Sequence, residues 1–393
     1  MPIPIEKLQR LAGLELNALR AAEVLGKKFE RVRIQPRGTP IYDINGDLLF
    51  YRIPLTRGRT FSGYVDIAAN EIFGEPLLAV AADAKWNEYL ILREARAAAR
   101  KRREIKFDSI RFVAYSFPKI ALQFLQDGKE VLMLEWKSWE EVPREPSRRE
   151  PTPPSNFERW SLVKELPGEI KESRIQNFKE RLEILENREL RRIDPTTISR
   201  RTFDLEFVQP VFADTREIHY SPRAADHHPC YELRGQQTSV WCVAASVEML
   251  LNFYRYHYDQ PRLAQELHLG TCASPNGLPY GDEWRVVDTI ERLSSNTLNA
   301  TDIANPGWAI YETEIKANRP LISFIPRHSR TVAGYTRSLI SLPGNLPFRG
   351  LLVYDPWPPT DCAHPEAGGV ITKWENFNTQ TYRYAFTAVL SHV

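Results

Sequence analysis

Apolar side chains recur at helical spacing at the start of the chain. Over residues 5–28 they fall three or four positions apart, which predicts an amphipathic helix. The pattern then changes to short β-rich runs. Residues 39–55 hold two such runs on either side of Asn45-Gly46, a dipeptide that favours a tight hairpin turn. Beyond this hairpin we expect two strands and a helix, at 60–70, 75–82 and 86–103.

The next segment closes a first unit of the chain. Residues 109–136 predict two more strands, with a turn at Asp127-Gly128. These elements together indicate a small α+β domain over residues 1–140. Residues 140–159 are rich in proline and charge and poor in apolar side chains, which is typical of a linker. A charged helix is expected over 166–193, so linker and helix together account for residues 141–200.

The last part of the chain is globular again, and we expect a second domain over residues 201–393. Its first clear helix is predicted at 241–258, where the residues Val247, Leu250, Leu251 and Tyr254 share one face. Cys242 lies in the first turn of that helix. A helix N-terminus carries unsatisfied N–H groups and partial positive charge, which lower the pKa of a thiol. Cys242 is therefore a candidate nucleophile, although a plain buried cysteine would fit the same position.

A thiol nucleophile needs a base and a means of stabilising the oxyanion. Gln236 lies six positions before Cys242, where its amide and the Cys242 N–H could converge on one oxygen; Gln237 is the alternative donor. His328 lies between two strand-like runs and can act as the base. Asp355 ends a strand-like run and can orient the histidine. Both residues also have a purely structural interpretation. His328 could be a hydrogen-bonded histidine at a strand edge, and Asp355 could start a turn before proline.

With the segments "RPLISF", "VAGY" and "LLVYDPW" in this order, residues 225–393 resemble papain-like cysteine peptidases. The likeness is to the compact bacterial branch related to bacteriocin-leader-processing peptidases. It implies an α+β domain of a helix and an antiparallel sheet, no cofactor and a polypeptide substrate. It also implies the roles of nucleophile for Cys242, base for His328, orienting group for Asp355 and oxyanion donor for Gln236.

Three further positions bear on this resemblance. Trp357 keeps the spacing of a tryptophan that shields the histidine's partner from water in papain. Val243 follows Cys242, where papain has tryptophan. Arg330 places a charge in a run that is normally apolar. The departures bear more on the oxyanion donor than on the nucleophile.

The first domain resembles the propeptides of streptopain-type cysteine proteases. The resemblance rests on "PIYDINGDLLFYRIPL" and on "FSGYVDIAANEIFGEPLLAVA". It implies that residues 1–140 are an intramolecular inhibitor or a folding aid, so that the chain is a zymogen. The alternative is an accessory domain that packs against the peptidase or binds its substrate.

Composition and sequence motifs limit the kinds of partner and the location that we expect for this protein. The formal net charge is +2, and we interpret the densest basic run, residues 93–103, as the solvated end of a helix, so we expect no nucleic-acid partner. No apolar run is long enough for a membrane span. The first residues lack the pattern of an export signal, which favours a cytoplasmic location, although streptopain-type proteins are exported. Nucleotide-binding glycine motifs are absent from the sequence.

The remaining cysteines suggest minor alternatives. His227, His228 and Cys230 lie close together, but zinc needs a fourth ligand that the sequence does not supply nearby. A disulfide between Cys230 and Cys272 also stays open. Four cysteines in 393 residues do not form a disulfide scaffold, so a reducing compartment is expected.

A cysteine peptidase is the function that this pattern favours. The same residues would serve an acyltransferase or amidase, which would differ in the group that accepts the acyl moiety. A papain-like binding module with an inert cysteine is the third alternative, and the reactivity of the thiol would separate it from the enzymes.

Overall fold

The fold is given by a computed structural model. It describes residues 3–21, 25, 32–82, 84, 86–102, 105–143, 159–185, 213–218, 233–338, 348–363 and 371–391. The linker predicted at 140–159 and the cluster of His227, His228 and Cys230 lie almost wholly or wholly outside these residues. No helix within the described ranges has the length and apolar content that crossing a membrane requires.

The N-terminal half consists of helices and a set of strands. Its helices are α1 (Ile5–Ala21) and α2 (Glu88–Arg100), with a 3-10 turn, η2 (Glu71–Phe73). Its strands are β1 (Arg33–Ile34), β2 (Thr39–Asp43), β3 (Leu48–Arg57), β4 (Thr60–Ala68), β5 (Leu77–Ala82), β6 (Ser109–Ser116), β7 (Lys119–Gln126) and β8 (Lys129–Glu135). These strands pair antiparallel except for β2 and β6, which pair in parallel. The short helix α3 (Leu162–Glu165) and the helix α4 (Gly168–Leu185) follow; Phe178 of α4 is buried against the N-terminal core.

The C-terminal half holds the remaining elements. Its helices are α5 (Cys242–Phe253), α6 (Gln260–Glu266), α7 (Trp284–Leu293) and α8 (Trp308–Lys316), with the 3-10 turn η5 (Phe377–Thr379). Its strands are β9 (Ala213–Glu217), β10 (Gly270–Thr271), β11 (Ser274–Pro275), β12 (Leu298–Ala304), β13 (Leu321–Ile325), β14 (His328–Ser338), β15 (Arg349–Asp355), β16 (Ile371–Asn376) and β17 (Tyr384–Leu390).

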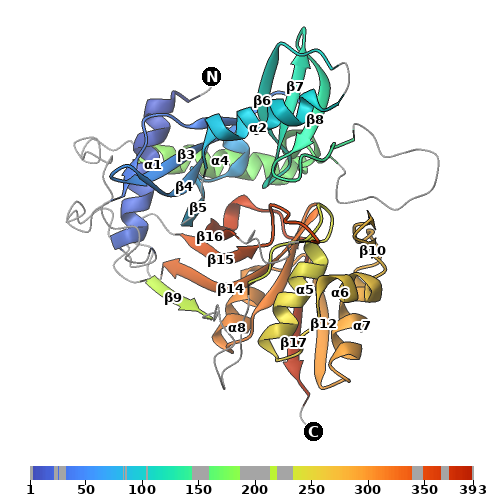
Figure 1. Cartoon of the computed structure of the whole chain (residues 1–393). Helices are drawn as coiled ribbons and strands as arrows, with labels where there is room; N and C mark the ends of the chain where they lie inside the picture. The colour runs from blue at the N-terminus through green and yellow to red at the C-terminus, as the bar shows by residue number, and fades with distance from the viewer. Residues whose placement is uncertain are drawn as a thin grey trace.

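One sheet runs through both halves of the described chain. Its main path is β12-β17-β13-β14-β15-β16-β5-β4-β3-β2-β6-β7-β8, so strands far apart in the sequence are hydrogen-bonded neighbours. The join is β16 against β5, with Trp374 opposite Val80. Figure 1 shows the consequence: the N-terminal strands lie above β16, and β15 and β14 follow below it. The α+β fold class is thus confirmed, and the C-terminal pairs are antiparallel as expected.

Local patterns predicted most elements correctly, with one notable difference. The hairpin at Asn45-Gly46 is present as β2 and β3, and Gly46 has the positive φ of 96° that the turn needs. Residues 109–136 form three strands and not the two expected. Phe117-Pro118 interrupts the first apolar run, because proline cannot continue the hydrogen-bonded ladder, and the chain reverses there between β6 and β7.

Helix α5 is buried along its whole length, which explains its uninterrupted apolar and small residues. It packs against β14 and β13 of the sheet. Ser246 is small enough to bring α5 close to β14, where it accepts a hydrogen bond from Ser329 at 2.9 Å. Since a helix on a sheet fixes the height of its first turn, Cys242 is held at the edge where β14 begins and β15 ends.

Candidate active site

Cys242 is the first residue of α5, as the sequence predicts. Its side chain is 2% exposed, and it is the free cysteine among the described residues. The carbonyl of Cys242 accepts a hydrogen bond from Ser246 at 2.8 Å, which holds the first turn closed. The indole of Trp241 is bonded to the carbonyl of Leu269 at 3.0 Å and fixes the residue before the thiol. The thiol thus lies on a rigid helix N-terminus.

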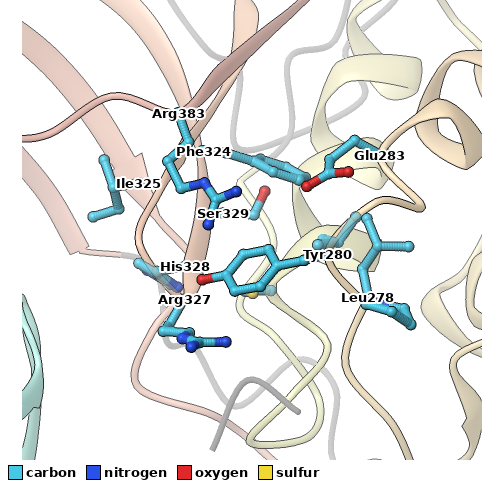
Figure 2. A pocket seen from close by; sticks show the side chains of 12 residues that line it. Leu278, Tyr280, Glu283, Phe324, Ile325, Arg327, His328, Ser329 and Arg383 are labelled. Carbon is cyan, nitrogen blue, oxygen red and sulfur yellow. The ribbon is translucent and has the colours of Figure 1, made fainter. Parts of the chain in front are cut away.

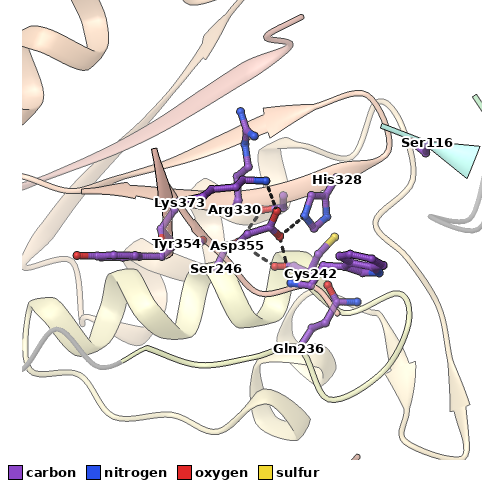
Figure 3. A network of polar contacts seen from close by, with 12 residues as sticks. Ser116, Gln236, Cys242, Ser246, His328, Arg330, Tyr354, Asp355 and Lys373 are labelled. Atoms are coloured by element: carbon purple, nitrogen blue, oxygen red, sulfur yellow. Dashed lines mark hydrogen bonds and ion pairs between the residues drawn. The ribbon is translucent and has the colours of Figure 1, made fainter. Parts of the chain in front are cut away.

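His328 and Asp355 meet beside this thiol. His328 begins β14 and Asp355 ends the neighbouring strand β15, so the sheet register brings the two side chains together. The Nε2 atom of His328 lies 2.6 Å from Oδ1 of Asp355. A carboxylate can only accept here, so Nε2 carries the proton and Nδ1 is left with a lone pair. Nδ1 is buried without a hydrogen-bond partner, and Figure 3 shows the Cys242 sulfur pointing toward the imidazole.

The second oxygen of Asp355 faces a lysine that the sequence analysis did not single out. Lys373 of β16 donates to Oδ2 at 2.7 Å, and the Trp357 N–H donates to Oδ1 at 3.1 Å. Lys373 also lies 3.6 Å from Glu375, which pairs with the fully buried Arg330 of β14. Arg330 is therefore a paired interior charge and not a surface residue. No local sequence pattern indicated this row, because its members come from three neighbouring strands.

Gln236 is held below the thiol by its backbone. Its N–H donates to the carbonyl of Pro356 at 2.9 Å, and its carbonyl accepts from the N–H of Thr360 at 2.7 Å. Figure 3 places its side chain next to Cys242. The side-chain Nε2 donates to the carbonyl of Thr238 at 2.8 Å, which leaves the second hydrogen of that amide for another acceptor. The backbone N–H of Gln237 instead donates to the side-chain oxygen of Gln260 at 2.9 Å.

The N-terminal half packs over this site. Ser116, at the end of β6, donates to the carbonyl of Pro326 at 3.2 Å, two residues before His328. Lys119, at the start of β7, is 1% exposed and lies close enough to Cys242 for its ammonium to act on the pKa of the thiol. Trp357 packs edge-on against Trp136 with ring centroids 5.3 Å apart. The tryptophan that was expected to shield the His–Asp contact thus also joins the two halves.

These surroundings set the protonation states. Burial raises the pKa of the Cys242 thiol, and the Lys119 ammonium opposes the shift only in part. Burial lowers the pKa of His328 against the opposing effect of Asp355. Burial alone would raise the pKa of Asp355, but Lys373 and His328 hold it well below its usual range. These shifts favour the neutral forms of the thiol and the imidazole and keep Asp355 ionised.

A small pocket reaches Cys242 and His328 and is lined by residues of the C-terminal half. Figure 2 shows Tyr280 in its wall, with Arg383 and Arg327 near the ring. The guanidinium carbons lie 3.9 Å and 4.4 Å from the ring centroid, respectively. Phe324 and Leu278 supply apolar wall. These residues come from separate loops and strands, which is why the sequence pattern did not group them.

The cysteine pairing differs from the alternative weighed above. Cys272 forms a disulfide with Cys362, across a sequence separation of 90 residues. The alternative of a disulfide between Cys230 and Cys272 is therefore wrong. The sequence gives no local signal for this pair. The β10–β11 hairpin and the segment after Trp357 become neighbours only once the sheet and α6 are in place. Among the described residues no group of three or more metal-binding side chains is present.

Comparison with known proteins adds a family match. Residues 226–382 match the model of the Peptidase_C39 like family, a stretch that is less than half of the chain and contains all four candidate residues. This supports a papain-like cysteine peptidase domain in the C-terminal half. Among solved structures, the crystal structure of UfSP from C. elegans is similar over 47% of this chain and 35% of its own, with 13% identity and a TM-score of 0.28. No curated protein matches.

Proposed function

We propose that this protein is a cysteine peptidase that hydrolyses peptide bonds with Cys242, His328 and Asp355. One observation carries the proposal. His328 Nε2 is hydrogen-bonded to Asp355 Oδ1 at 2.6 Å, while Nδ1 has no hydrogen-bond partner and lies on the side of the Cys242 sulfur. This arrangement matches the needs of a thiol nucleophile with an oriented base. The finer assignment to the bacteriocin-leader-processing branch remains part of the proposal.

The geometry supports a two-step acyl transfer. Nδ1 of His328 takes the proton of the Cys242 thiol as the sulfur attacks the peptide carbonyl carbon. The oxyanion that forms meets the Cys242 N–H and the free hydrogen of the Gln236 amide. His328 then gives its proton to the leaving amine, and the C–N bond breaks to leave a thioester. Water, losing a proton to His328, hydrolyses the thioester and restores the thiol.

We further propose that the N-terminal half holds the peptidase latent. Cys242 and His328 are only 2% and 3% exposed, and the pocket beside them is small. Ser116 and Lys119 of the N-terminal half pack beside the site, and their displacement would widen the approach to the sulfur. The same burial keeps the thiol protonated, which lowers its nucleophilicity. Displacement or cleavage of the N-terminal half would then activate the enzyme.

The first experiment compares the full chain with Cys242→Ala, His328→Ala and the control His257→Ala. His257 is bonded to Asn252 and lies away from the thiol, so its loss should leave activity intact. Each protein is incubated at pH 4–9 with and without reductant, and chain cleavage and labelling by a thiol-directed epoxide are followed by mass spectrometry. Labelling and self-cleavage lost in the first two variants only would support the proposal. Ordinary thiol reactivity in every cleaved form would favour the inert binding module.

A further inference from the structure

Both carboxylate oxygens of Asp355 have charged partners. Oδ1 faces His328 Nε2 at 2.6 Å, and Oδ2 accepts from Lys373 Nζ at 2.7 Å. Asp355 is 2% exposed and Lys373 is 5% exposed, so solvent does little to screen either contact. Two short contacts on opposite oxygens fix the plane of the carboxylate. Lys373 on Oδ2 and the Trp357 N–H on Oδ1 therefore orient the carboxylate toward His328.

Lys373 is itself held in place from behind. Its Nζ lies 3.6 Å from Oε2 of Glu375, and the same oxygen accepts from Arg330. Glu375 is 1% exposed and Arg330 is fully buried. The side chains alternate in sign along the row Arg330, Glu375, Lys373 and Asp355, and their formal charges cancel. A buried row of this kind is stable only while each member keeps its partner.

We propose that Lys373 is a positioning residue of this site. Its ammonium holds the Asp355 carboxylate charged and oriented toward His328, and it cancels the charge that Asp355 would otherwise exert on the imidazole. The proposal rests on the proposed function, because it assigns a role in the same reaction. The same ammonium is one of the charges that lower the pKa of His328.

Two other cationic side chains also lie near Asp355 and His328. Arg52 of β3 lies near Asp355, but it is paired with Asp66 of β4 through two contacts of 2.8 Å, so that pair adds little net charge. Lys119 of β7 acts on His328 in the same direction as Lys373. Lys373 is the cation in contact with Asp355, and its removal leaves the carboxylate with only His328 and the Trp357 N–H.

The test measures the pKa of His328 by NMR titration of the full chain in a Cys242→Ala background. Lys373→Met should raise this pKa by about one unit, the usual effect of a neighbouring charge. Lys373→Arg keeps the charge and should stay within a few tenths of a unit of the parent. A lysine that only supports the fold would change stability but leave the pKa of His328 unchanged in both variants, and that result would overturn the proposal.

A second variant gives an effect of opposite sign. Glu375→Gln removes the negative charge behind Lys373, so the positive charge near His328 increases and its pKa should fall. The pKa of His328 in Glu375→Gln also tests the proposal if the Lys373→Met protein does not fold. A rise in Glu375→Gln, or no change, would contradict the proposal.

In the Cys242-containing chain, the rate of Cys242 alkylation gives an independent measurement. Lys373→Met should shift its pH profile toward lower pH, because a protonated His328 favours the thiolate. Peptide hydrolysis should fall roughly tenfold as the imidazole loses its orientation. If no variant of the chain cleaves peptides, the proposed function fails, whereas the NMR titration still decides the role of Lys373. A profile unchanged by Lys373→Met would count against that role.

Discussion

The indole Nε1 of Trp357 donates a hydrogen bond to Oε1 of Glu135 at 3.0 Å. Trp357 follows Asp355 by two residues and Glu135 ends β8, so this contact joins the candidate active site to the N-terminal half. Tyr115 donates to the same carboxylate oxygen at 2.6 Å. Glu135 is fully buried and therefore depends on these donors.

Glu135→Ala should loosen the cover over the thiol. The indole and the Tyr115 hydroxyl would lose their acceptor inside the protein, at a cost of about 1–3 kcal/mol each in the free energy of unfolding. We expect faster alkylation of Cys242 at pH 7 and a lower thermal midpoint. Glu130→Ala is the matched control, because Glu130 lies on the same strand and pairs with Arg159, not with Trp357. Equal alkylation rates in both variants would argue against a latching role for Glu135.

The pH dependence of Cys242 alkylation should reveal the raised pKa of the thiol. In the folded full chain the rate should rise only above the pH at which an unperturbed thiol, with a pKa of about 8.5, ionises. In urea the same cysteine should return to the ordinary value. Stopped-flow or mass-spectrometric labelling at Cys242 checks this. A folded-state profile at or below that of the unfolded chain would mean that the resting site already holds a thiolate.

Asp355→Asn should lower both stability and activity. The variant breaks the buried pair of Asp355 and Lys373 and leaves the ammonium with Glu375, 3.6 Å away, as its counter-charge; breaking a buried pair costs about 3–5 kcal/mol. The sign of its pH dependence follows from the lowered pKa of Asp355. The wild-type advantage is complete above the unfolded pKa of about 3.9 and is lost as pH falls toward the folded value. Urea unfolding at pH 7 and pH 3 should show a gap that narrows at the lower pH; a constant gap would contradict the charge assignment.

Replacing Cys272 and Cys362 together by serine should destabilise the C-terminal half. A bond that closes 90 residues restricts the unfolded chain, and its loss costs about 2–5 kcal/mol. The segment of Pro356 and Thr360 that holds the Gln236 backbone ends at this bond, so peptide hydrolysis should also weaken. Unfolding midpoints of the oxidised wild type and the double variant give the measurement. Identical midpoints would mean that the bond contributes nothing in solution.

The sequence alone was sufficient for features that depend on neighbouring residues. The spacing of Val247, Leu250 and Leu251 indicated α5, and the break before it located Cys242 at the helix start. His328 and Asp355 were found because each lies at the end of a short apolar run, and such runs are recognisable without knowing their partners. The hairpin at Asn45-Gly46 follows from turn chemistry in the same way.

Only the tertiary structure decided which distant segments meet. Strand order and register bring three such pairs into contact: Lys373 with Asp355, Cys362 with Cys272, and Ser116 with Pro326. Nothing in a local pattern encodes register between strands hundreds of residues apart, such as β5 and β16. Local hydrophobic periodicity specifies elements and their buried faces, whereas long-range packing selects the partners of charged and sulfur-containing side chains. For that reason the candidate nucleophile, base and orienting residue could be named from the sequence, while the cover and the charge row around them could not.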